Sequence, residues 1–441
     1  MTDNNKSESY FVYAETQKVG TITFSSSLNF DFSYDKTWIK SGYALSPHLP
    51  LREHIEVRNI LRFIKNLLPE GTGLEILRHT FLLSRHNIAE LIKHIASDTA
   101  GIVHFESPDV IEQELRELSE QELTSRVSVG SNVVLFDGVF RLGVAGVQKK
   151  LNVYVKDDGT FLLGNTTLTS THILKFEPKA SYLVLNELFC MRLAQKIGLP
   201  VAATMLQKLV SAERQYYTLV VKRFDREILE DGSVSKRHII DGCQALNLPP
   251  EHKYELIYGS NRDVERYRDG ANLPQLFDFT RQHCQSEDAI YQLLVWVCFN
   301  LVIGNSDAHA KNISFYVDQL GIQLAPFYDL VSIVFEAKDE PKLDTSLAMA
   351  IGDEFDINAI TAYHLLCFAE KAGIPPEQLK NVLSSVATAC IESASVSLCH
   401  DTDLLRLEKR FLVQLIALIK QRATHFLHEV TLFDEIQRTL F

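Results

Sequence analysis

The sequence predicts an α+β protein with two lobes, the first rich in strands and the second mostly helical. Strand-like runs recur up to about residue 226, whereas the chain after residue 239 has mainly helical periodicity. A chain of 441 residues also exceeds what one hydrophobic core usually supports. We therefore expect four segments: an N-terminal subdomain (1–108), a helical connector (109–130), a β-containing lobe (131–238) and an α-helical lobe (239–441).

The first segment is predicted to begin with strands and continue with helices. Residues 10–24 alternate in character and turn at residues 15–18, which is typical of a hairpin. Helical periodicity follows in three runs, with Pro-Glu-Gly separating the first two: 60–68, 73–82 and 88–96. The acidic run 111–126 carries leucines at helical spacing, so we expect a solvated connecting helix.

The two lobes differ in their predicted elements. Three strand-like runs and one helical run follow residue 140: strands at 151–155, 172–176 and 217–224, and a helix at 182–197. This order resembles the N-terminal lobe of a protein kinase. The last segment is predicted to be helical, including residues 404–428, apart from a short hairpin after residue 312.

Composition restricts the class of protein. The net charge of -12 argues against a general electrostatic grip on nucleic acid, so we expect any DNA contact to be made through a partner. No run of about 18–20 apolar residues could span a membrane, and no secretory signal is visible. The seven scattered cysteines contain no C-x-x-C pair, and the fifteen histidines show no zinc spacing. These features predict a cytosolic protein without zinc.

The most informative stretch is residues 304–312, which read G-N-S-D-A-H-A-K-N. An apolar helix, 293–303, precedes it, and Gly-Asn ends that helix in a loop. In a kinase catalytic loop an Asp orients the acceptor hydroxyl, and an Asn five residues later binds a magnesium ion on the ATP phosphates. Asp307 and Asn312 have this spacing.

A second carboxylate follows the predicted hairpin. Strand-like residues 313–317 and 322–325 lead to P-F-Y-D, and its Asp329 lies where a second metal ligand is expected. Asp, Asn and His are also common in turns because they hydrogen-bond to their own backbone. The combination of loop, hairpin and second Asp nevertheless favours a phosphoryl-transfer site.

The candidate nucleotide residues lie in the β-containing lobe. Residues 142–150, L-G-V-A-G-V-Q-K-K, could bring backbone N–H groups and an ammonium to phosphates, although glycine turns before strands are common. Lys175 closes a strand, as the ATP-positioning lysine of a kinase does. Such a lysine needs a carboxylate partner on the next helix, and Glu187 is the best candidate. An exposed strand-end lysine is the alternative.

The strand 219–225 resembles the one that leads to a kinase hinge, where backbone groups would bind the adenine edge. Phe224 could cover the adenine ring, or it could belong to the core.

Together these motifs resemble the HipA family of bacterial serine/threonine kinases, the toxins of toxin–antitoxin pairs. The resemblance extends over nearly the whole chain and rests on ordered motifs: S-P-H-L-P-L-R-E, N-L-L-P-E-G, D-T-A-G-I-V-H-F, V-A-G-V-Q-K-K, T-H-I-L-K, N-E-L-F-C with G-L-P-V, V-V-K-R-F-D-R, C-Q-A-L-N-L-P with K-Y-E, G-N-S-D-A-H-A-K-N and P-F-Y-D-L. It implies a two-lobed, protein-kinase-like fold with an extra N-terminal subdomain.

The resemblance also implies roles for single residues. Asp307 would be the catalytic base, Asn312 and Asp329 the magnesium ligands, and Lys175 the phosphate-anchoring lysine. The phosphate loop would comprise Ala145, Gly146, Val147, Gln148, Lys149 and Lys150. Further nucleotide contacts would come from Lys222, Arg223, Phe224, Gln244, His309, Lys311 and Tyr328.

Two positions depart from the family pattern. Members commonly have a serine before V-A-G whose autophosphorylation silences the kinase, whereas this chain has Gly143. Control would then fall to the antitoxin or to Ser128 or Ser131. A glutamate common at the hinge is replaced by Lys222, which matters little if backbone groups bind adenine.

The sequence thus predicts an ATP- and Mg²⁺-dependent protein serine/threonine kinase. The resemblance implies a HipB-like helix-turn-helix antitoxin as partner, and an aminoacyl-tRNA synthetase or another translation component as target, with growth arrest as the outcome. Three alternatives stay open: a nucleotide-binding pseudokinase that acts as a transcriptional co-repressor with an antitoxin, a small-molecule kinase, and a metal-dependent phosphohydrolase using Asp307, His309 and Asp329.

Overall fold

The structure is a computed structural model of the 441-residue chain. It describes residues 8–26, 30–52, 55–84, 87–94, 98–106, 115–129, 135–136, 139–140, 149–164, 169–177, 181–210, 215–259, 266–338, 340 and 342–440.

The chain divides into two units, and each unit consists of three separate segments of the sequence. The first unit contains residues 1–177, 207–240 and 316–320, and the second contains 178–206, 241–315 and 321–441. The division after residue 240 lies near the expected lobe boundary. Residues 178–206, which we assigned to the first lobe, are part of the second unit by their contacts. The four-segment division itself stays a prediction.

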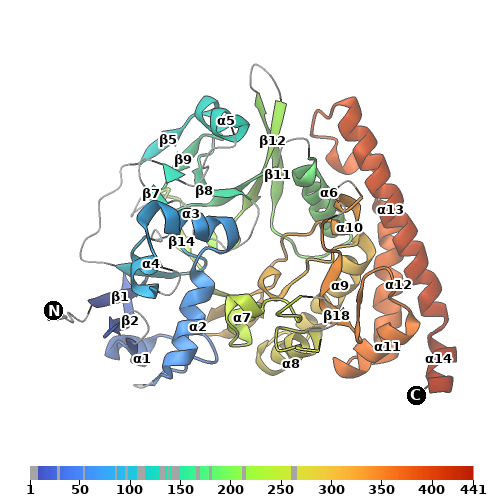
Figure 1. Cartoon of the computed structure of the whole chain (residues 1–441), viewed down its shortest axis with the longest axis horizontal. Helices are drawn as coiled ribbons and strands as arrows, with labels where there is room; N and C mark the ends of the chain where they lie inside the picture. The colour runs from blue at the N-terminus through green and yellow to red at the C-terminus, as the bar shows by residue number, and fades with distance from the viewer. Residues whose placement is uncertain are drawn as a thin grey trace. The chain divides into compact units, whose positions relative to one another are not determined.

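The first unit opens with a four-stranded antiparallel sheet in the order β3-β2-β1-β4. Its strands are β1 (Glu8–Ala14), β2 (Gln17–Phe24), β3 (Phe30–Tyr34) and β4 (Val103–Glu106). Four helices lie between β3 and β4 in the chain (Figure 1): α1 (Lys36–Ser41), α2 (Val57–Leu67), α3 (Gly71–Phe81) and α4 (Ile88–His94). The predicted hairpin and the three predicted helical runs are therefore confirmed.

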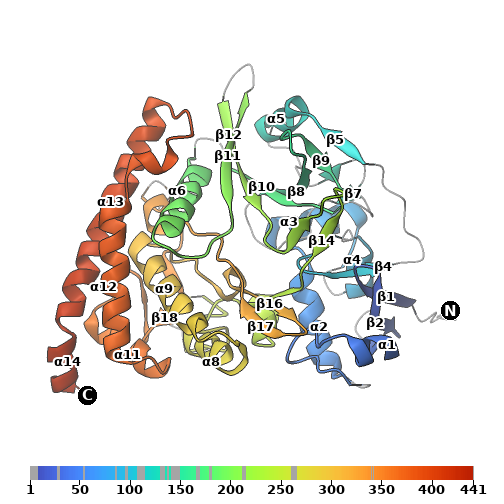
Figure 2. The ribbon, with the colours of Figure 1, turned by 180° about the vertical axis from the view of Figure 1, so that it is seen from behind.

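The second sheet of this unit has the order β11-β12-β10-β8-β9-β5 (Figure 2). Its strands are β5 (Arg116–Leu118), β8 (Lys150–Val155), β9 (Phe161–Leu163), β10 (His172–Phe176), β11 (Thr204–Val210) and β12 (Gln215–Lys222). Short strands complete the unit: β6 (Leu135–Phe136), β7 (Val139–Phe140), β13 (Arg226–Ile228) and β14 (Val234–Lys236).

The expected connecting helix is shorter than predicted. Residues Arg116–Leu118 form β5, which pairs with β9, and helix α5 (Glu120–Val129) begins only after Ser119. The Ser119 hydroxyl accepts a hydrogen bond from the Glu122 amide at 3.2 Å and so caps the helix. Strand pairing therefore overrides the helical spacing of the leucines before this cap.

A buried ionic cluster joins distant segments of the first unit. Arg223 and Arg226 both bind Asp98 and Asp225, and their closest contact is 2.7 Å between Arg226 and Asp225. Both guanidinium groups also donate to the carbonyl oxygen of Thr99. The cluster fastens the D-T-A-G segment to the end of β12, which explains why residues 1–106 belong to the same unit as the second sheet.

The second unit is mostly helical, as predicted. Its helices are α6 (Leu183–Lys196), α7 (Gly242–Ala245), α8 (Leu273–His283), α9 (Asp288–Ile303), α10 (Ile333–Glu336), α11 (Ala362–Lys371), α12 (Pro376–Ser393), α13 (Arg406–Thr431) and α14 (Phe433–Leu440). Short 3₁₀ turns span Pro250–His252, Ala310–Asn312 and Val396–Cys399. Helices α9, α12 and α13 pack against one another and bury α9 (Figure 1).

The remaining strands, β15 to β19, follow helix α6 in the chain and are short. The division between the units falls within β15 (Ile239–Asp241) and β16 (Ser314–Asp318). Strands β16 and β17 (Gly321–Leu324) occupy the hairpin positions expected after residue 312. A second hairpin, β18 (Ser346–Ile351) with β19 (Glu354–Asp356), was not predicted.

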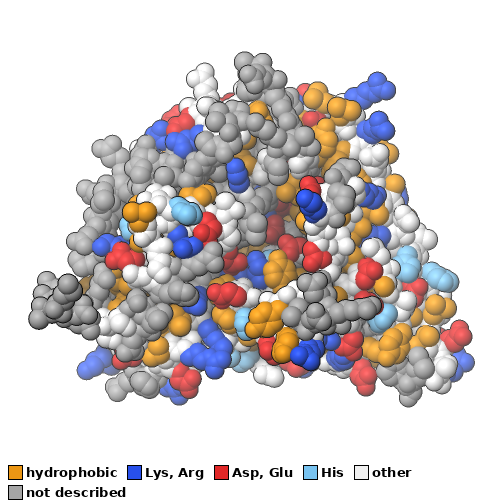
Figure 3. All heavy atoms as spheres, in the orientation of Figure 1, with side chains coloured by type: hydrophobic (Ala, Val, Ile, Leu, Met, Phe, Trp, Pro, Cys, Tyr) orange, Lys and Arg blue, Asp and Glu red, His pale blue; other side chains and the backbone are white. Residues whose placement is uncertain are grey.

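Surface character varies along the second unit. In Figure 3, hydrophobic and basic side chains gather over the upper part of α13, where Leu407 and Val413 are exposed.

Candidate active site

The catalytic loop begins where α9 ends. Gly304 caps this helix in the left-handed region, with φ of 73°. A Cβ at this position would lie 3.1 Å from the Cβ of Val334, so both backbone conformation and space require glycine. The next residue, Asn305, is fixed by its side-chain hydrogen bond to Asn300 Oδ1 at 2.7 Å. The loop therefore leaves a buried helix in one defined direction.

Within the loop, Asn312 is hydrogen-bonded to Asp307, the residue with which it was predicted to act. Its Nδ2 donates to the carbonyl oxygen of Asp307 at 3.0 Å. Its backbone amide donates to the carbonyl oxygen of His309 at 2.9 Å, which closes the 3₁₀ turn. Because the Asn312 nitrogen is used inside the loop, the amide oxygen is the atom that could bind a metal ion.

Tyr254 is the residue that our sequence reasoning missed. Its hydroxyl donates to Asp307 Oδ1 at 2.8 Å, although 53 residues separate the two in the chain. Its ring also packs edge-on against His309, with ring centroids 5.2 Å apart. Tyr254 belongs to the K-Y-E motif that resembles the HipA family, but nothing in the sequence indicated that it contacts Asp307.

The environment of Asp307 raises its pKa to about 6. Desolvation is the largest cause, and the negative charge of Asp329 adds to it, while the Tyr254 hydrogen bond and Lys253 act in the opposite direction. Protein surrounds Asp307 closely, although solvent reaches the side chain. The raised pKa moves this carboxylate toward that of a general base that works near neutral pH.

Asp329 has a backbone conformation that few residues of its kind adopt. Its φ is 60°, in the left-handed region, and its side chain is half-buried. Such a conformation persists when the surroundings hold it, and it is enriched at functional sites. Its carboxylate is close enough to Asp307 to affect that pKa.

The donor atoms of Asn312 and Asp329 suit magnesium. Among the described residues, His, Cys, Asp and Glu side chains form no group of three or more placed to hold a metal ion. Magnesium commonly binds one or two carboxylates and completes its shell with water and substrate phosphates. Two oxygen ligands from the protein therefore fit a Mg²⁺ ion that arrives with a nucleotide.

Three residues predicted to contact the nucleotide form a network around the loop. Lys311 makes an ion pair with Asp241, which in turn forms a capping box with Gln244 at the start of α7. The Tyr328 hydroxyl donates to the carbonyl oxygen of Lys311 at 2.7 Å, and burial raises the pKa of Tyr328 above its usual range. These contacts position the loop, and nucleotide contacts by these residues stay a prediction.

In the first unit, two predicted phosphate-binding lysines lie opposite each other. Lys150 on β8 and Lys175 on β10 are direct partners in the antiparallel register. Their side chains therefore share one face of the sheet, and they are only 5 % and 6 % exposed. Phosphate contacts by these two lysines stay a prediction.

The expected adenine contacts stay a prediction. The Arg223 guanidinium is buried in the ionic cluster with Asp98 and Asp225, so any nucleotide contact by this residue would come from its backbone. Lys222 is exposed and pairs with His172 in the register, on the opposite face from Lys175. Phe224 packs edge-on against Tyr316, 6.0 Å between centroids.

The remaining predicted residues are less informative. Lys149 is exposed beside β8, and Glu187 is buried within α6. Ala145, Gly146, Val147 and Gln148 lie outside the described residues, as do Gly143 and Ser131. The side chain of Ser128 is not described either.

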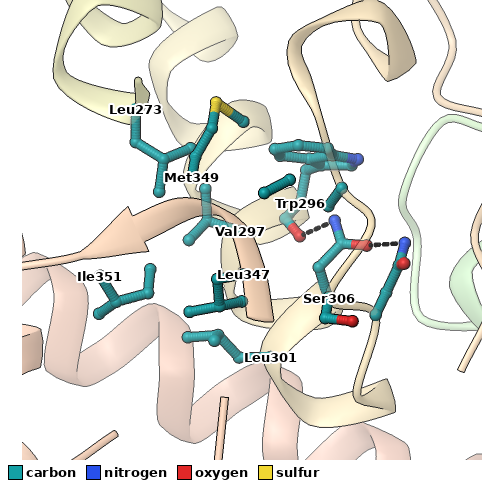
Figure 4. A pocket seen from close by; sticks show the side chains of 12 residues that line it. Leu273, Trp296, Val297, Leu301, Ser306, Leu347, Met349 and Ile351 are labelled. Carbon is teal, nitrogen blue, oxygen red and sulfur yellow. Dashed lines mark hydrogen bonds between the residues drawn. The ribbon is translucent and has the colours of Figure 1, made fainter. Parts of the chain in front are cut away.

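A cavity lies behind the catalytic loop, between α9 and β18 (Figure 4). Its volume is ≈ 20 Å³, and Trp296, Val297, Leu347 and Met349 contribute to its lining. A space of this size holds about one water molecule, so it is not a nucleotide site.

Within the described parts of the chain, no helix combines the length and apolar composition needed to cross a membrane.

Comparisons with known proteins agree with this architecture. The model of the HipA N-terminal domain matches residues 10–106, and that of the HipA-like C-terminal domain matches residues 142–394. Over 377 residues the chain is 38% identical to the serine/threonine-protein kinase toxin HipA of Shewanella oneidensis. This alignment covers 84% of each of the two chains. It is 30% identical over 410 residues to the putative kinase Y4mE of Sinorhizobium fredii, covering 89% of this chain and 92% of that one.

A solved structure resembles the chain over almost its full length. It is the complex of Shewanella oneidensis HipA, HipB and operator DNA, in which the matched chain has a TM-score of 0.85 and 34% sequence identity. The match covers 97% of this chain and 99% of the other. The predicted two-lobed, kinase-like α+β fold is therefore confirmed. By these matches, the chain belongs to the HipA family and is a serine/threonine-protein kinase.

Proposed function

We propose that this kinase transfers the γ-phosphoryl group of ATP to a serine or threonine of a protein, with magnesium as the metal ion. The observation that carries the proposal is the arrangement around Asp307. Its carboxylate accepts a hydrogen bond from Tyr254, its carbonyl oxygen accepts one from Asn312, and desolvation, with a smaller contribution from the charge of Asp329, raises its pKa. Base and metal ligands thus belong to one organised loop region.

Asp307 would accept the proton of the acceptor hydroxyl. The hydroxyl oxygen forms a bond to the γ-phosphorus while the bond from that phosphorus to the bridging oxygen breaks, and ADP leaves. A bound Mg²⁺ would neutralise charge on the phosphates, with Asn312 Oδ1 and Asp329 as its protein ligands. Most of the rate enhancement would come from positioning and charge stabilisation.

The first unit would supply contacts to the nucleotide. Lys150 and Lys175 place two positive charges on one face of the second sheet, which suits a polyphosphate. Glu187 is proposed to orient Lys175. The other proposed contacts are Lys149, residues 145–148, Lys222, the backbone of residues 223–224, Gln244, His309, Lys311 and Tyr328.

The partner and target are also proposals. The similar Shewanella oneidensis chain was solved with HipB and operator DNA, which supports a HipB-like antitoxin as partner and contact with DNA through it. We place the activity in the cytosol and expect an aminoacyl-tRNA synthetase or another translation component as substrate. Phosphorylation of such a target would arrest growth.

The test is phosphoryl transfer from γ-labelled ATP with Mg²⁺ in a bacterial lysate. The variants are wild type, Asp307→Asn, and Asp278→Asn as a matched control, because Asp278 lies in an exposed ion pair on α8. We expect the same labelled protein band with wild type and Asp278→Asn and none with Asp307→Asn. Mass spectrometry of that band would identify the target.

Other outcomes separate the alternatives. Labelled small molecules without labelled protein would indicate a small-molecule kinase. ATP binding without any transfer would favour a co-repressor that acts together with its antitoxin on DNA. Equal labelling by wild type and Asp307→Asn would contradict the assignment of the base.

A further inference from the structure

Asn186 on α6 pairs with a backbone segment far away in the sequence. Its Nδ2 donates to the carbonyl oxygen of Ser332 at 3.1 Å, and the Ser332 amide donates back to Asn186 Oδ1 at 3.0 Å. The same Nδ2 also donates to Glu336 Oε1 at 2.7 Å. Both N–H groups of this amide are used, and the residue is 0 % exposed. Asn186 is thus a buried amide whose donors and acceptor are all hydrogen-bonded.

The paired segment begins at the proposed metal ligand. Ser332 lies three residues after Asp329, and the two residues between them, Leu330 and Val331, are buried. Asn186 therefore fixes the chain on the C-terminal side of Asp329. Glu336, its other partner, is the last residue of α10, so Asn186 contacts that helix as well.

The N-terminal side of Asp329 is fixed by the same part of the chain. The Phe327 amide donates to the carbonyl oxygen of Pro200 at 2.8 Å, and the Ala202 amide donates to the carbonyl oxygen of Phe327 at 2.9 Å. Pro200 and Ala202 follow α6 directly. Residues 186–202 thus hold the chain both two residues before and three residues after Asp329.

We infer that Asn186 is a positioning residue that keeps Asp329 in its metal-binding conformation. The backbone of Asp329 has φ of 60°, which an aspartate maintains only when neighbouring contacts hold it. Asn186 supplies three such contacts from a rigid helix. This inference rests on the proposed function, since it takes Asp329 as a ligand of Mg²⁺.

The arrangement also has a consequence for regulation. Glu187, the proposed partner of Lys175, directly follows Asn186 on α6. Because Asn186 is bonded to the segment after Asp329, this helix and the metal-binding segment move together. Kinases that switch by moving the corresponding helix and loop separately need these two parts to be independent. The Asn186 bonds oppose such a switch in this chain.

The test measures how Mg²⁺ changes nucleotide binding, by calorimetry with a non-hydrolysable ATP analogue in the presence and absence of Mg²⁺. Asn186→Leu removes these three hydrogen bonds, and the one that Asn186 Oδ1 accepts from Cys190 Sγ, at similar volume. Asp329→Asn removes the proposed ligand charge. Asn66→Leu is the matched control, since Asn66 is also buried on a helix but lies in the first unit, where it bonds to Arg62.

Partners that orient a metal ligand typically change metal affinity by about 10- to 100-fold when removed. We expect Asn186→Leu to lose a factor in this range from the Mg²⁺-dependent strengthening, with binding in the absence of Mg²⁺ unchanged. Asn66→Leu should keep the wild-type strengthening. A purely structural role would weaken binding with and without Mg²⁺ alike, and that result would overturn the inference.

A second variant protects the test against misfolding. Asn186→Asp keeps the size and the acceptor for the Ser332 amide, but it places a carboxylate oxygen against Ser332 O and Glu336. It should show the same selective loss of Mg²⁺ dependence. If Asp329→Asn keeps the full Mg²⁺ effect, the proposed metal site is wrong. If only the Asn186 variants keep it, the metal site stands and the positioning role fails.

Discussion

The catalytic loop region and the lysine-bearing sheet are organised in opposite ways. Around Asp307, donors are paired with acceptors and opposite charges with each other. Tyr254 donates a hydrogen bond to the Asp307 carboxylate, Asn312 donates one to the Asp307 carbonyl oxygen, and Lys311 forms an ion pair with Asp241. On the second sheet, two buried lysines of like charge face each other across β8 and β10. The loop is therefore positioned by hydrogen bonds and an ion pair within the second unit, whereas the sheet gathers two positive charges on one face, which suits the polyphosphate that we propose as its ligand.

The strongest test of the organised loop is the removal of its base. Asp307→Asn keeps the shape of the side chain but cannot accept the proton of the acceptor hydroxyl. Losing a general base typically slows the chemical step by about 10²- to 10⁴-fold. We expect this loss in the rate of single-turnover transfer, with the affinity for ATP largely retained. A variant that transfers at the wild-type rate would show that another group takes the proton.

Arg223 tests whether the first unit contains a structural cluster or a nucleotide contact at this position. Arg223→Met leaves Asp98 and Asp225 with one fewer positive partner in a buried site. Breaking a buried ion pair from one side typically costs about 3–5 kcal/mol of stability. We expect a large fall in the free energy of unfolding, measured by denaturant titration. At temperatures where the variant stays folded, its ATP affinity should match the wild type.

The pH dependence of activity tests the electrostatics of the loop. The pKa of Asp307 is raised to about 6 in the folded protein, so the ionised base accumulates as pH rises through this value. We expect kcat/KM to increase with pH along an acid limb with an apparent pKa near this value. Stability changes with pH in the opposite direction to activity. The folded state favours the protonated form of Asp307, so the contribution of this group to the free energy of unfolding is lost as pH rises from about 4 to 6.

Tyr254→Phe sharpens that experiment. It removes the hydrogen bond that lowers the pKa of Asp307, so the acid limb should move to higher pH. The variant should be slowed most at pH 6 and least at pH 8, where the base is ionised in both proteins. Tyr258→Phe is the control, because Tyr258 is exposed in the same region of the chain. An unchanged pH profile for Tyr254→Phe would contradict the positioning of Asp307 by this hydroxyl.

The sequence predicted what is local and missed what depends on distant contacts. Asp307, Asn312 and Asp329 could be proposed from the sequence because they lie within one loop and hairpin at the spacing that phosphoryl transfer needs. Tyr254 and Asn186 act through tertiary hydrogen bonds, which no spacing reveals. Similarly, β18 is an apolar run without alternation, buried at nearly all its positions, so period-2 patterning could not identify it. The ion pairs of the Arg223 side chain could not be predicted either, because its partner Asp98 lies 125 residues away.

The smallest expected effect addresses the lysine pair. Lys150→Met keeps a long side chain on β8 and removes one of two like charges that face each other. Its ATP affinity should fall, because one phosphate contact is lost. Thermal unfolding with and without ATP measures this effect, and Lys156→Met is the control, because Lys156 is exposed and directly follows β8. A variant that ATP stabilises as much as it stabilises wild type would contradict a phosphate contact by Lys150, and the contrast between the two regions would then disappear.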